Sequence, residues 1–366
     1  MPRAWPRDRI NPVARSLVPT GDRALSPLTD RPTMRPTRVL SIALHNPTDS
    51  DDPAERVRIN LDNITALLER AATFDPDFVC LPEAALQHAS NHLLDDVAQP
   101  IPGPATEVIG EHARALDSYV LLPMYERDGD SFYNATALVD PSGEVIGTYR
   151  KLAPTLGEMA AGITPGEEVP VWDTPFGRVG ILICWDARYA EVGTELGAKG
   201  ANLVFFPTHG TTHNQLRTWA QYHGYHVVSC DKNDAKVYTP RREVTAEVGD
   251  NWKNPEVEDI DLHGGRAWLS FAELNTDMKS YAKASDTVWT WGKEVQRKYG
   301  GSVVLDVAPG DGVFVLESID EDVSLADIEA DLEMETTRGY EDRTRARIHE
   351  TIEDSPLRRL DEWPDV

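Results

Sequence analysis

The sequence predicts an α/β fold in which a sheet of mixed strand direction is buried by helices. Short apolar runs alternate with amphipathic stretches along residues 38–233. The apolar runs are nearly continuous, as expected for strands covered on both faces. A turn at Pro141, Ser142 and Gly143 joins two of them as an antiparallel hairpin, so the strands cannot all be parallel. Together these patterns indicate helices packed against a mixed sheet.

The first half of the chain supplies a strand, a helix and a longer run of strands. We expect the first strand at 38–47, "RVLSIALHNP". The helix after it shows one apolar face, because its apolar residues are spaced by four, three, four and three positions: Val57, Leu61, Ile64, Leu68 and Ala71. The elements that follow are a short strand that starts at 77 and ends at Pro82 and Glu83, a helix at about 105–117, a strand at 119–126 and a hairpin at 133–151.

The second half continues the alternation and then loses it. The expected elements are a strand at 179–184, a helix at 190–199, a strand at 202–208, a helix at 212–224 and a strand at 226–233. Residues 234–300 are polar and contain four tryptophans, which predicts that this stretch packs on something: Trp252, Trp268, Trp289 and Trp291. A last strand pair is expected within 300–319, followed by a charged, partly helical tail from about 334.

The two ends differ in composition from the middle of the chain. The first 38 residues contain eight arginines and three aspartates, are rich in proline and show no apolar periodicity. We therefore expect a disordered leader at 1–37, one domain at 38–350 with an insertion at about 234–300, and a tail at 351–366. Met34 stands just before the first strand, so the sequence leaves open whether Met1 or Met34 is the true start.

The charge of the chain excludes several classes of partner. The formal net charge is −25, and phosphate-rich partners require clustered basic residues, so nucleic acid and anionic membranes are not expected. No run approaches the roughly 18 apolar residues of a membrane span, and no secretory signal is evident, which predicts a cytoplasmic protein. Many acids and only nine lysines suggest a salt-rich (halophilic) cytoplasm, with an ordinary acidic enzyme as the alternative.

The three cysteines and the histidines give no metal or disulfide pattern. The chain has an odd number of cysteines, without C-x-x-C spacing: Cys80, Cys184 and Cys230. At least one thiol should therefore be free. Cys80 and Cys230 lie in apolar strands and are interpreted as structural. His209 and His213 have metal-like spacing, but without an evident third ligand we interpret them as wall or cap of a site and expect no metal.

Three chemically capable residues stand where apolar strands give way to polar chain. They are Glu83, Lys151 and Cys184, separated by 68 and 33 residues. Such strand ends are where α/β sheets build ligand sites, so the fold could gather the three at one rim. Each also has a structural interpretation: the cysteine as a buried apolar residue, Glu83 as the cap of a helix starting at Ala84, and Lys151 as a solvated strand end.

These residues lie in segments that resemble the carbon-nitrogen hydrolase superfamily, also called the nitrilase superfamily. The segments are "LPEAAL", "YRKLAPTLGE" and "GILICWDARYAE" with "ELGAKGANLVFFPT" after it. The resemblance covers about 38–232, and 301–350 less fully. It implies a four-layer α-β-β-α sandwich and a homodimer or higher homo-oligomer. It further implies Cys184 as nucleophile, Glu83 as general base and acid, Lys151 as oxyanion stabiliser and Glu158 as a supporting glutamate.

The chemistry of these residue types agrees with that resemblance. A thiolate attacks an amide carbonyl, and a carboxylate within reach can take the thiol proton. The Lys151 ammonium and a backbone N–H near Trp185 would stabilise the oxyanion that forms. Glu83 would then protonate the departing amine and activate water against the thioester. This chemistry needs no cofactor.

The residues after the cysteine suggest which branch of the superfamily the chain resembles. Amide and carbamoyl hydrolases of the superfamily more often carry an aspartate at the position of Asp186, whereas nitrilases tend to carry a glutamate. Arg188 resembles an arginine of carbamoylases and omega-amidase-like enzymes that could meet a substrate carboxylate, or it forms a structural salt bridge. Trp185 and Tyr189 line the site or fill core, and Glu126 and His209 are further candidates for contact with substrate.

The leading hypothesis is therefore an amidohydrolase whose partner is a small-molecule amide or carbamoyl substrate. A nitrilase that converts a nitrile to carboxylic acid and ammonia is the second interpretation. A catalytically silent interaction protein on the same fold is the third, although a scaffold would not need all three residues of the Glu-Lys-Cys triad.

Overall fold

The computed structural model describes most of the chain after the leader. It covers residues 36–45, 50–88, 90, 93–210, 212–249, 260–262, 265–282, 287–308, 313–352 and 355–357. The chain divides into two units, Met1–Pro32 and Thr33–Val366, and all that follows concerns the second. The expected leader up to residue 35, the choice between Met1 and Met34, and residues 358–366 of the expected tail lie outside the described residues.

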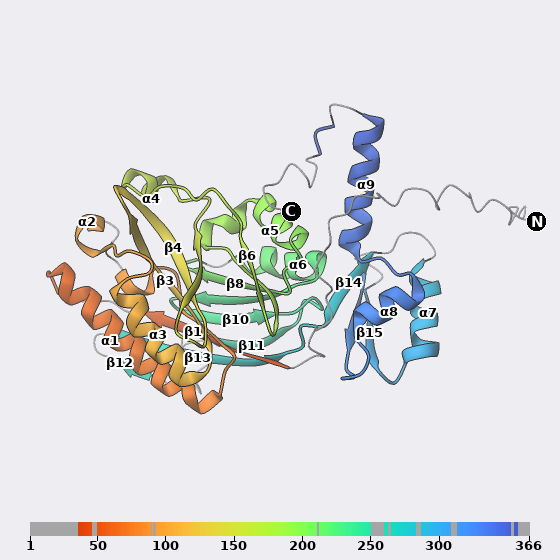
Figure 1. Ribbon diagram of the computed structural model, residues 1–366, viewed down its shortest axis with the longest axis horizontal. Helices are drawn as coiled ribbons and strands as arrows, with labels where there is room; N and C mark the ends of the chain where they lie inside the picture. The colour runs from red at the N-terminus through yellow and green to blue at the C-terminus, as the bar shows by residue number, and fades with distance from the viewer. Residues whose placement is uncertain are drawn as a thin grey trace, which may run out of the picture. The chain divides into compact units, whose positions relative to one another are not determined.

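Two large mixed sheets form the body of the second unit (Figure 1). The first has the order β12 (Ile260–Leu262), β13 (Gly265–Leu274), β1 (Thr37–His45), β2 (Phe78–Cys80), β3 (Tyr119–Asp128), β4 (Ser131–Val139) and β5 (Val145–Arg150). The second has the order β11 (Val244–Gly249), β10 (Asp234–Tyr238), β9 (His226–Asp231), β8 (Leu203–Thr208), β7 (Gly177–Ile181) and β6 (Val171–Thr174). Strands β1 to β3 and β7 to β9 run parallel, and their neighbours pair antiparallel.

Helices cover the outer face of each sheet, which gives the four-layer α-β-β-α sandwich. Helices α1 (Pro53–Ala71) and α3 (Pro104–Leu116) pack on the first sheet, and α5 (Ala190–Ala198) and α6 (His213–His223) on the second. Between the sheets, Phe78 and Leu121 of the first meet Ile181 and Phe205 of the second in one buried cluster. The residue pattern alone predicted one sheet, and the family resemblance predicted the two that are present.

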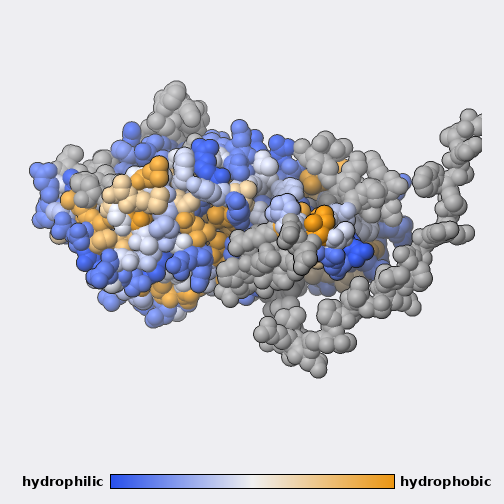
Figure 2. Space-filling model, turned by 90° about the horizontal axis from the view of Figure 1, so that it is seen from above, coloured by the Kyte–Doolittle hydropathy of each residue, from blue (hydrophilic) through white to orange (hydrophobic). Residues whose placement is uncertain are grey.

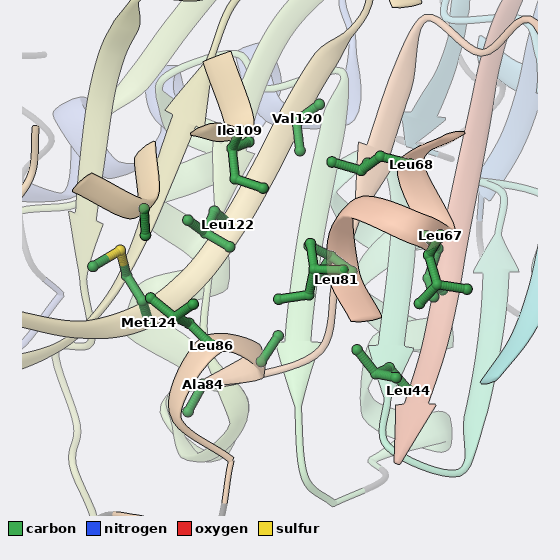
Figure 3. Packing of buried hydrophobic residues seen from close by; sticks show 14 of the residues in the cluster. Leu44, Leu67, Leu68, Leu81, Ala84, Leu86, Ile109, Val120, Leu122 and Met124 are labelled. Carbon is green, nitrogen blue, oxygen red and sulfur yellow. The ribbon is translucent and has the colours of Figure 1, made fainter. Parts of the chain in front are cut away.

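The outer core of the first sheet shows how the helix pattern determines the packing (Figure 3). Leu67 and Leu68 of α1 and Ile109 of α3 are fully buried against the strands. Of the face predicted for α1, Leu61 is half-buried at its edge, and the rest is buried: Val57, Ile64, Leu68 and Ala71. Met124 of β3 packs beside Ala84 and Leu86, so this core also supports the chain on either side of Glu83.

The C-terminal part builds a smaller third sheet with a hydrophobic cluster of its own. Its order is β14 (Met278–Ala282), β16 (Val313–Ser318) and β15 (Val303–Ala308), and it packs with helices α7 (Thr287–Tyr299) and α8 (Leu325–Leu332). Helix α9 (Thr337–Thr351) follows. The tail was therefore correctly expected to be partly helical.

The stretch 234–300 contributes to all three sheets. Strands β10 and β11 extend the second sheet, β13 pairs with β1 along its whole length, and β14 starts the third. Trp268 of β13 is buried in one cluster with Ala43 and Ala235, as the tryptophan content of the stretch suggested. Much of this segment is thus part of the sandwich, and its description as an insertion stays a prediction.

The surface carries both polar and apolar side chains. On the face shown in Figure 2, hydrophilic side chains surround scattered apolar patches. Across the described part of the chain, no helix combines the length and apolar content needed to cross a membrane.

Candidate active site

Glu83 lies in a turn that follows the short buried strand β2. Ala84 adopts a left-handed conformation, with φ of 48°, so no α-helix begins there and the interpretation of Glu83 as a helix cap is wrong. A short 3-10 turn, η3 (Ala85–Gln87), follows instead. Asn60 of α1 donates to the Leu86 carbonyl at 2.9 Å, and Gln87 exchanges hydrogen bonds with the Tyr125 backbone at 2.8 and 3.2 Å. These bonds fix the turn, and Glu83 is only 4% exposed.

Lys151 follows strand β5 and is buried, so the interpretation of a solvated strand end is wrong. Its side chain is 1% exposed, and its ammonium donates to two carboxylates. The Nζ atom lies 2.7 Å from Glu83 Oε1 and 2.9 Å from each oxygen of Glu158. All three N–H groups of the ammonium are therefore engaged. Residues 68 positions apart in the chain meet directly, as the strand-end argument predicted.

Glu158 has a second function at the start of the short helix α4 (Leu156–Ala160). Thr155 caps this helix, and Glu158 completes a capping box by accepting the Thr155 N–H at 2.7 Å through Oε2. The same carboxylate accepts from Lys151 and from Asn134 Nδ2, the latter at 2.8 Å. The helix cap therefore positions a carboxylate beside the ammonium.

Cys184 lies at a sharp elbow just beyond strand β7. Its φ of 47° is left-handed, which a non-glycine residue adopts at a cost on the order of 1 kcal/mol, and the 3-10 helix η4 (Cys184–Arg188) continues from it. The residue is half-buried, whereas Cys80 and Cys230 are 0% exposed. The interpretation of Cys80 and Cys230 as structural fits this burial, and Ser41 Oγ contacts Cys230 Sγ at 3.0 Å.

Asp186 holds this elbow and does not face the solvent. It is 0% exposed, and its carboxylate accepts three hydrogen bonds: Tyr149 OH at 2.6 Å, Ile183 N at 2.9 Å and Ala153 N at 2.8 Å. Tyr149 and Ala153 flank Lys151 in the chain. Asp186 therefore connects the cysteine elbow of the second sheet to the lysine segment of the first.

Burial, together with the charges of the surrounding cluster, keeps the Cys184 thiol protonated at rest. Lys151 pairs with the carboxylates of both Glu83 and Glu158, so its positive charge is shared between two acids. Burial, followed by the negative charge of Glu83, raises the pKa of Cys184 to about 11, although Lys151 acts to lower it. The thiol and not the thiolate is the resting form at neutral pH.

The two charged partners of Cys184 remain ionised. Burial acts to raise the pKa of Glu83, but the nearby Lys151 and His209 outweigh it and leave that pKa below its ordinary value. Burial acts to lower the pKa of Lys151, but Glu83, Cys184 and Glu158 together raise it. Each member of the trio thus alters the pKa of the other two.

The three residues suggested after the cysteine are exposed near it. Trp185 is 41% exposed and Tyr189 is 46% exposed, so neither fills core. The Arg188 guanidinium lies 5.2 Å from the centre of the Trp185 ring, in cation–π contact. Among the residues that the structure describes, no carboxylate lies within 4.0 Å of Arg188, so the expected alternative of a salt bridge is not seen.

Glu126 and His209 occupy different surroundings. Glu126 is 3% exposed, and both of its oxygens accept from Arg150 at 2.7 Å, so its carboxylate orients the residue that precedes Lys151. His209 follows β8, and its Nδ1 lies 3.9 Å from Glu83 Oε2, the oxygen that Lys151 does not contact. His209 therefore lies beside Glu83, in keeping with its interpretation as wall or cap of a site. Contact of either residue with substrate stays a prediction.

His213 has different contacts from those of His209. Its ring bonds to the Tyr238 hydroxyl and to Lys236 Nζ, the latter at 3.2 Å. Within the described ranges, no group of three or more histidine, cysteine, aspartate or glutamate side chains is placed to hold a metal ion.

Two neighbours of the site were not predicted from the sequence. Asn134 of β4 is 1% exposed and donates to Glu83 as well as to Glu158. Tyr125 lies opposite it on β3, and burial together with the charges of Glu83, Glu158 and Cys184 raises its pKa. An asparagine inside the apolar run "NATALV", in the strand paired with the lysine strand, was the available signal.

Comparisons with known proteins agree with the motifs. The family model described as carbon-nitrogen hydrolase matches residues 46–229, half of the chain. Nitrilase 2 of Arabidopsis thaliana is 38% identical over 109 residues, which cover 30% of this chain and 32% of that protein. Omega-amidase NIT2-B of Xenopus laevis is 29% identical over 173 residues, which cover 43% and 62%. The chain thus spans about a third of the length of the first relative and about three fifths of the length of the second.

A solved structure supports the fold independently of these sequences. The crystal structure of Saccharomyces cerevisiae Nit3, a member of branch 10 of the nitrilase superfamily, aligns with a TM-score of 0.56 at 21% identity. The alignment covers 73% of this chain and 98% of that one. The sandwich architecture is therefore shared. The third sheet begins well beyond the segment that the family model matches.

Proposed function

Because the chain belongs to the carbon-nitrogen hydrolase family, we propose that it hydrolyses a small linear amide or N-carbamoyl compound through a thioester on Cys184. The observation that carries this proposal is the buried contact of 2.7 Å between Lys151 Nζ and Glu83 Oε1, next to a half-buried cysteine at a strained elbow. A thiol, a carboxylate and an ammonium in one site supply nucleophile, base and oxyanion partner.

In the first step, the Cys184 sulfur forms a bond to the substrate carbonyl carbon while its proton passes to Glu83. Oε2 is the receiving atom, because Oε1 already accepts from Lys151 and Asn134. The carbonyl π electrons move onto oxygen, so a negative charge leaves Glu83 and appears on the oxyanion. The net charge of the site does not change, which avoids separating charge in a buried environment.

Lys151 gains a free donor in this same step. At rest its three N–H groups are held by Glu83 and Glu158. Once Glu83 is neutral, its oxygen is a weaker acceptor, and the N–H that it held can turn to the oxyanion. Glu158 stays bound through Asn134 and the Thr155 N–H, so the ammonium can move without losing its second carboxylate.

In the second step, the intermediate collapses and the carbon–nitrogen bond breaks. The proton on Glu83 goes to the departing nitrogen, which leaves as ammonia or amine, and Cys184 holds the acyl group as a thioester. Water then attacks the thioester carbonyl, gives a proton to Glu83, and the carbon–sulfur bond breaks. The sulfur recovers that proton, which restores the resting site.

Residues outside the trio would select the substrate. Trp185 and Tyr189 expose aromatic surface beside the nucleophile, and Arg188 presents a guanidinium without a carboxylate partner among the described residues. A carboxylate on the substrate would suit Arg188. Asp186, which resembles the aspartate of amidases, is fully buried, so any influence on substrate choice acts through the elbow.

Cellular context remains a proposal that rests on composition and family. We propose a cytoplasmic homodimer or higher homo-oligomer suited to high salt, because the net charge of −25 would destabilise the fold through self-repulsion at low ionic strength. Light scattering and thermal melts across a range of potassium chloride concentrations test this. A monomer whose melting temperature does not rise with salt would contradict it.

The test of function is a substrate panel read by ammonia release. The panel contains linear amides, N-carbamoyl amino acids and nitriles, assayed in high salt with Cys184→Ala as the control. Carbamoyl substrates should also release carbon dioxide. A nitrilase is the second candidate, because Nitrilase 2 is among the similar proteins. Turnover of nitriles alone would select it, and no turnover with any class by a folded protein would favour an interaction protein.

A further inference from the structure

Asn134 stands at the centre of the carboxylate pair. Its Nδ2 atom lies 2.8 Å from Glu83 Oε1 and 2.8 Å from Glu158 Oε1, so each of its two amide protons goes to a different carboxylate. Its backbone carbonyl accepts the Lys151 N–H at 2.8 Å. One residue therefore contacts both glutamates through its side chain and the lysine through its backbone.

The Asn134 amide and the Lys151 ammonium bind the same oxygen of Glu83. Oε1 receives both Lys151 and Asn134, at 2.7 and 2.8 Å, while Oε2 lies toward His209 at 3.9 Å. An ammonium is a compact charge that attracts a carboxylate from many directions, whereas an amide N–H is directional. The hydrogen bond from Asn134 therefore restricts rotation of the Glu83 carboxylate about its Cγ–Cδ bond. The Lys151 ammonium restricts this rotation less.

The orientation of the Asn134 side chain follows from its partners. Its Oδ1 is buried and has no hydrogen-bond partner among the described residues. Turning the amide over would satisfy neither end, because Oδ1 would then face two carboxylate oxygens. The side chain thus keeps a buried acceptor unpaired in order to point its N–H groups at Glu83 and Glu158, which indicates that both carboxylates are acceptors at rest.

We propose that Asn134 is a positioning residue that turns Oε2 of Glu83 toward Cys184 by holding both glutamates through its two amide N–H groups. This inference rests on the proposed function, because it assigns Glu83 the proton of the thiol. Asn134 adds no charge to the site, so it stabilises the two carboxylates without weakening the negative field that returns the proton to sulfur at the end of the cycle.

Three variants of the full-length chain separate positioning from packing. Asn134→Leu removes both donors at similar volume. Asn134→Asp keeps the shape but replaces the donors with a third acid. The control is Thr136→Val, on the same strand and face, at 0% exposure, whose hydroxyl has no partner among the described residues. Circular dichroism shows whether each variant folds.

The first readout is turnover of the best amide of the panel as a function of pH. For Asn134→Leu we expect kcat to fall about 10- to 100-fold with KM changed less than about threefold, since a base displaced by an ångström or less costs this much. The acid limb should move to higher pH by about half a pH unit or more, because Glu83 loses a donor to its charged form. Thr136→Val should match the wild type.

The relative turnover of the two Asn134 variants distinguishes a positioning role from a packing role. A packing role predicts that the isosteric Asn134→Asp is the better enzyme. The positioning role predicts that it is the worse, because a third acid pushes a proton onto Glu83. A better Asn134→Asp, or an acid limb that does not move in Asn134→Leu, would overturn the proposal.

The second readout needs no substrate and so separates this inference from the proposed function. Alkylation of Cys184 by iodoacetamide, followed by mass spectrometry, reports on the thiolate fraction of Cys184, which depends on the charge and orientation of Glu83 beside it. A displaced acid limb of labelling in Asn134→Leu supports the positioning role even if no amide is hydrolysed, which would refute the amidase proposal alone. Unchanged labelling together with wild-type turnover would refute the positioning role alone.

Discussion

Replacing Glu83 with glutamine should abolish turnover and yet make the Cys184 thiol more acidic. The two donors at Oε1, Lys151 and Asn134, would hold the new amide with its oxygen toward them. Its NH2 group would then occupy the position of Oε2, facing the sulfur. The substitution therefore replaces a negative charge beside the thiol with a hydrogen-bond donor, and both changes favour the thiolate.

The structure limits the size of this effect. The pKa of Cys184 is about 11 against an ordinary value of 9.0, a difference of about two pH units, which makes the thiolate about 100-fold scarcer at a given pH. Burial is the first cause of that difference and the charge of Glu83 the second. Removing the charge should therefore increase the thiolate fraction by more than about threefold and by less than about 100-fold.

The assay is iodoacetamide labelling between pH 7 and pH 10 by mass spectrometry. Cys80 and Cys230 are 0% exposed, so labelling of the folded chain reports on Cys184. Glu195→Gln is the matched control, because Glu195 is also buried and paired with a lysine, Lys199, at 3.1 Å. Equal or slower labelling of Glu83→Gln at pH 9, or retained hydrolysis, would refute the placement of Glu83 beside the sulfur.

Three further predictions follow from individual contacts. Lys151→Met leaves two buried carboxylates without their cation, so turnover should vanish. For the same reason the free energy of unfolding, measured in urea, should fall by about 3–5 kcal/mol. A fall of less than about 1 kcal/mol would contradict the pairing. Burial raises the pKa of Asp186 from 3.8 to about 6, so ionisation of Asp186 destabilises the fold. As pH falls from about 6 to about 4, the free energy of unfolding of the wild type should rise by up to about 3 kcal/mol relative to Asp186→Asn. A difference that stays constant with pH would show that Asp186 titrates normally. Arg188→Ala should raise KM about tenfold or more for amides that carry a carboxylate and little for neutral amides, whereas equal effects would exclude a carboxylate contact.

Local periodicity predicted the elements better than their assembly. The helix face of Val57, Ile64 and Leu68 is buried as its spacing required. The division into two sheets was not predictable from residue patterns alone, because β1 pairs with β13 across more than 220 residues of chain. Buried strands of either sheet have the same apolar character, so nothing local shows which partner a strand will take.

Members of the candidate site could be proposed from the sequence where a side chain follows a strand, and not where it lies within one. Glu83, Lys151 and Cys184 follow apolar strands, and their motifs made them candidates. Asn134 lies within a strand, and its importance depends on two glutamates from other segments. Asp186 was interpreted as a substrate signal, but its three hydrogen bonds join two sheets, which no pattern around the cysteine could reveal.

The central claim is that Cys184 forms a covalent thioester within the buried Glu83–Lys151 site. Rapid acid quench of the wild-type chain during turnover of its best amide, followed by peptide mass spectrometry, tests this most directly. We predict an acyl adduct on the peptide containing Cys184, absent from Cys184→Ala and absent from the peptides with Cys80 and Cys230. Steady turnover with no adduct on Cys184, together with ammonia release by Cys184→Ala at the wild-type rate, would contradict the account.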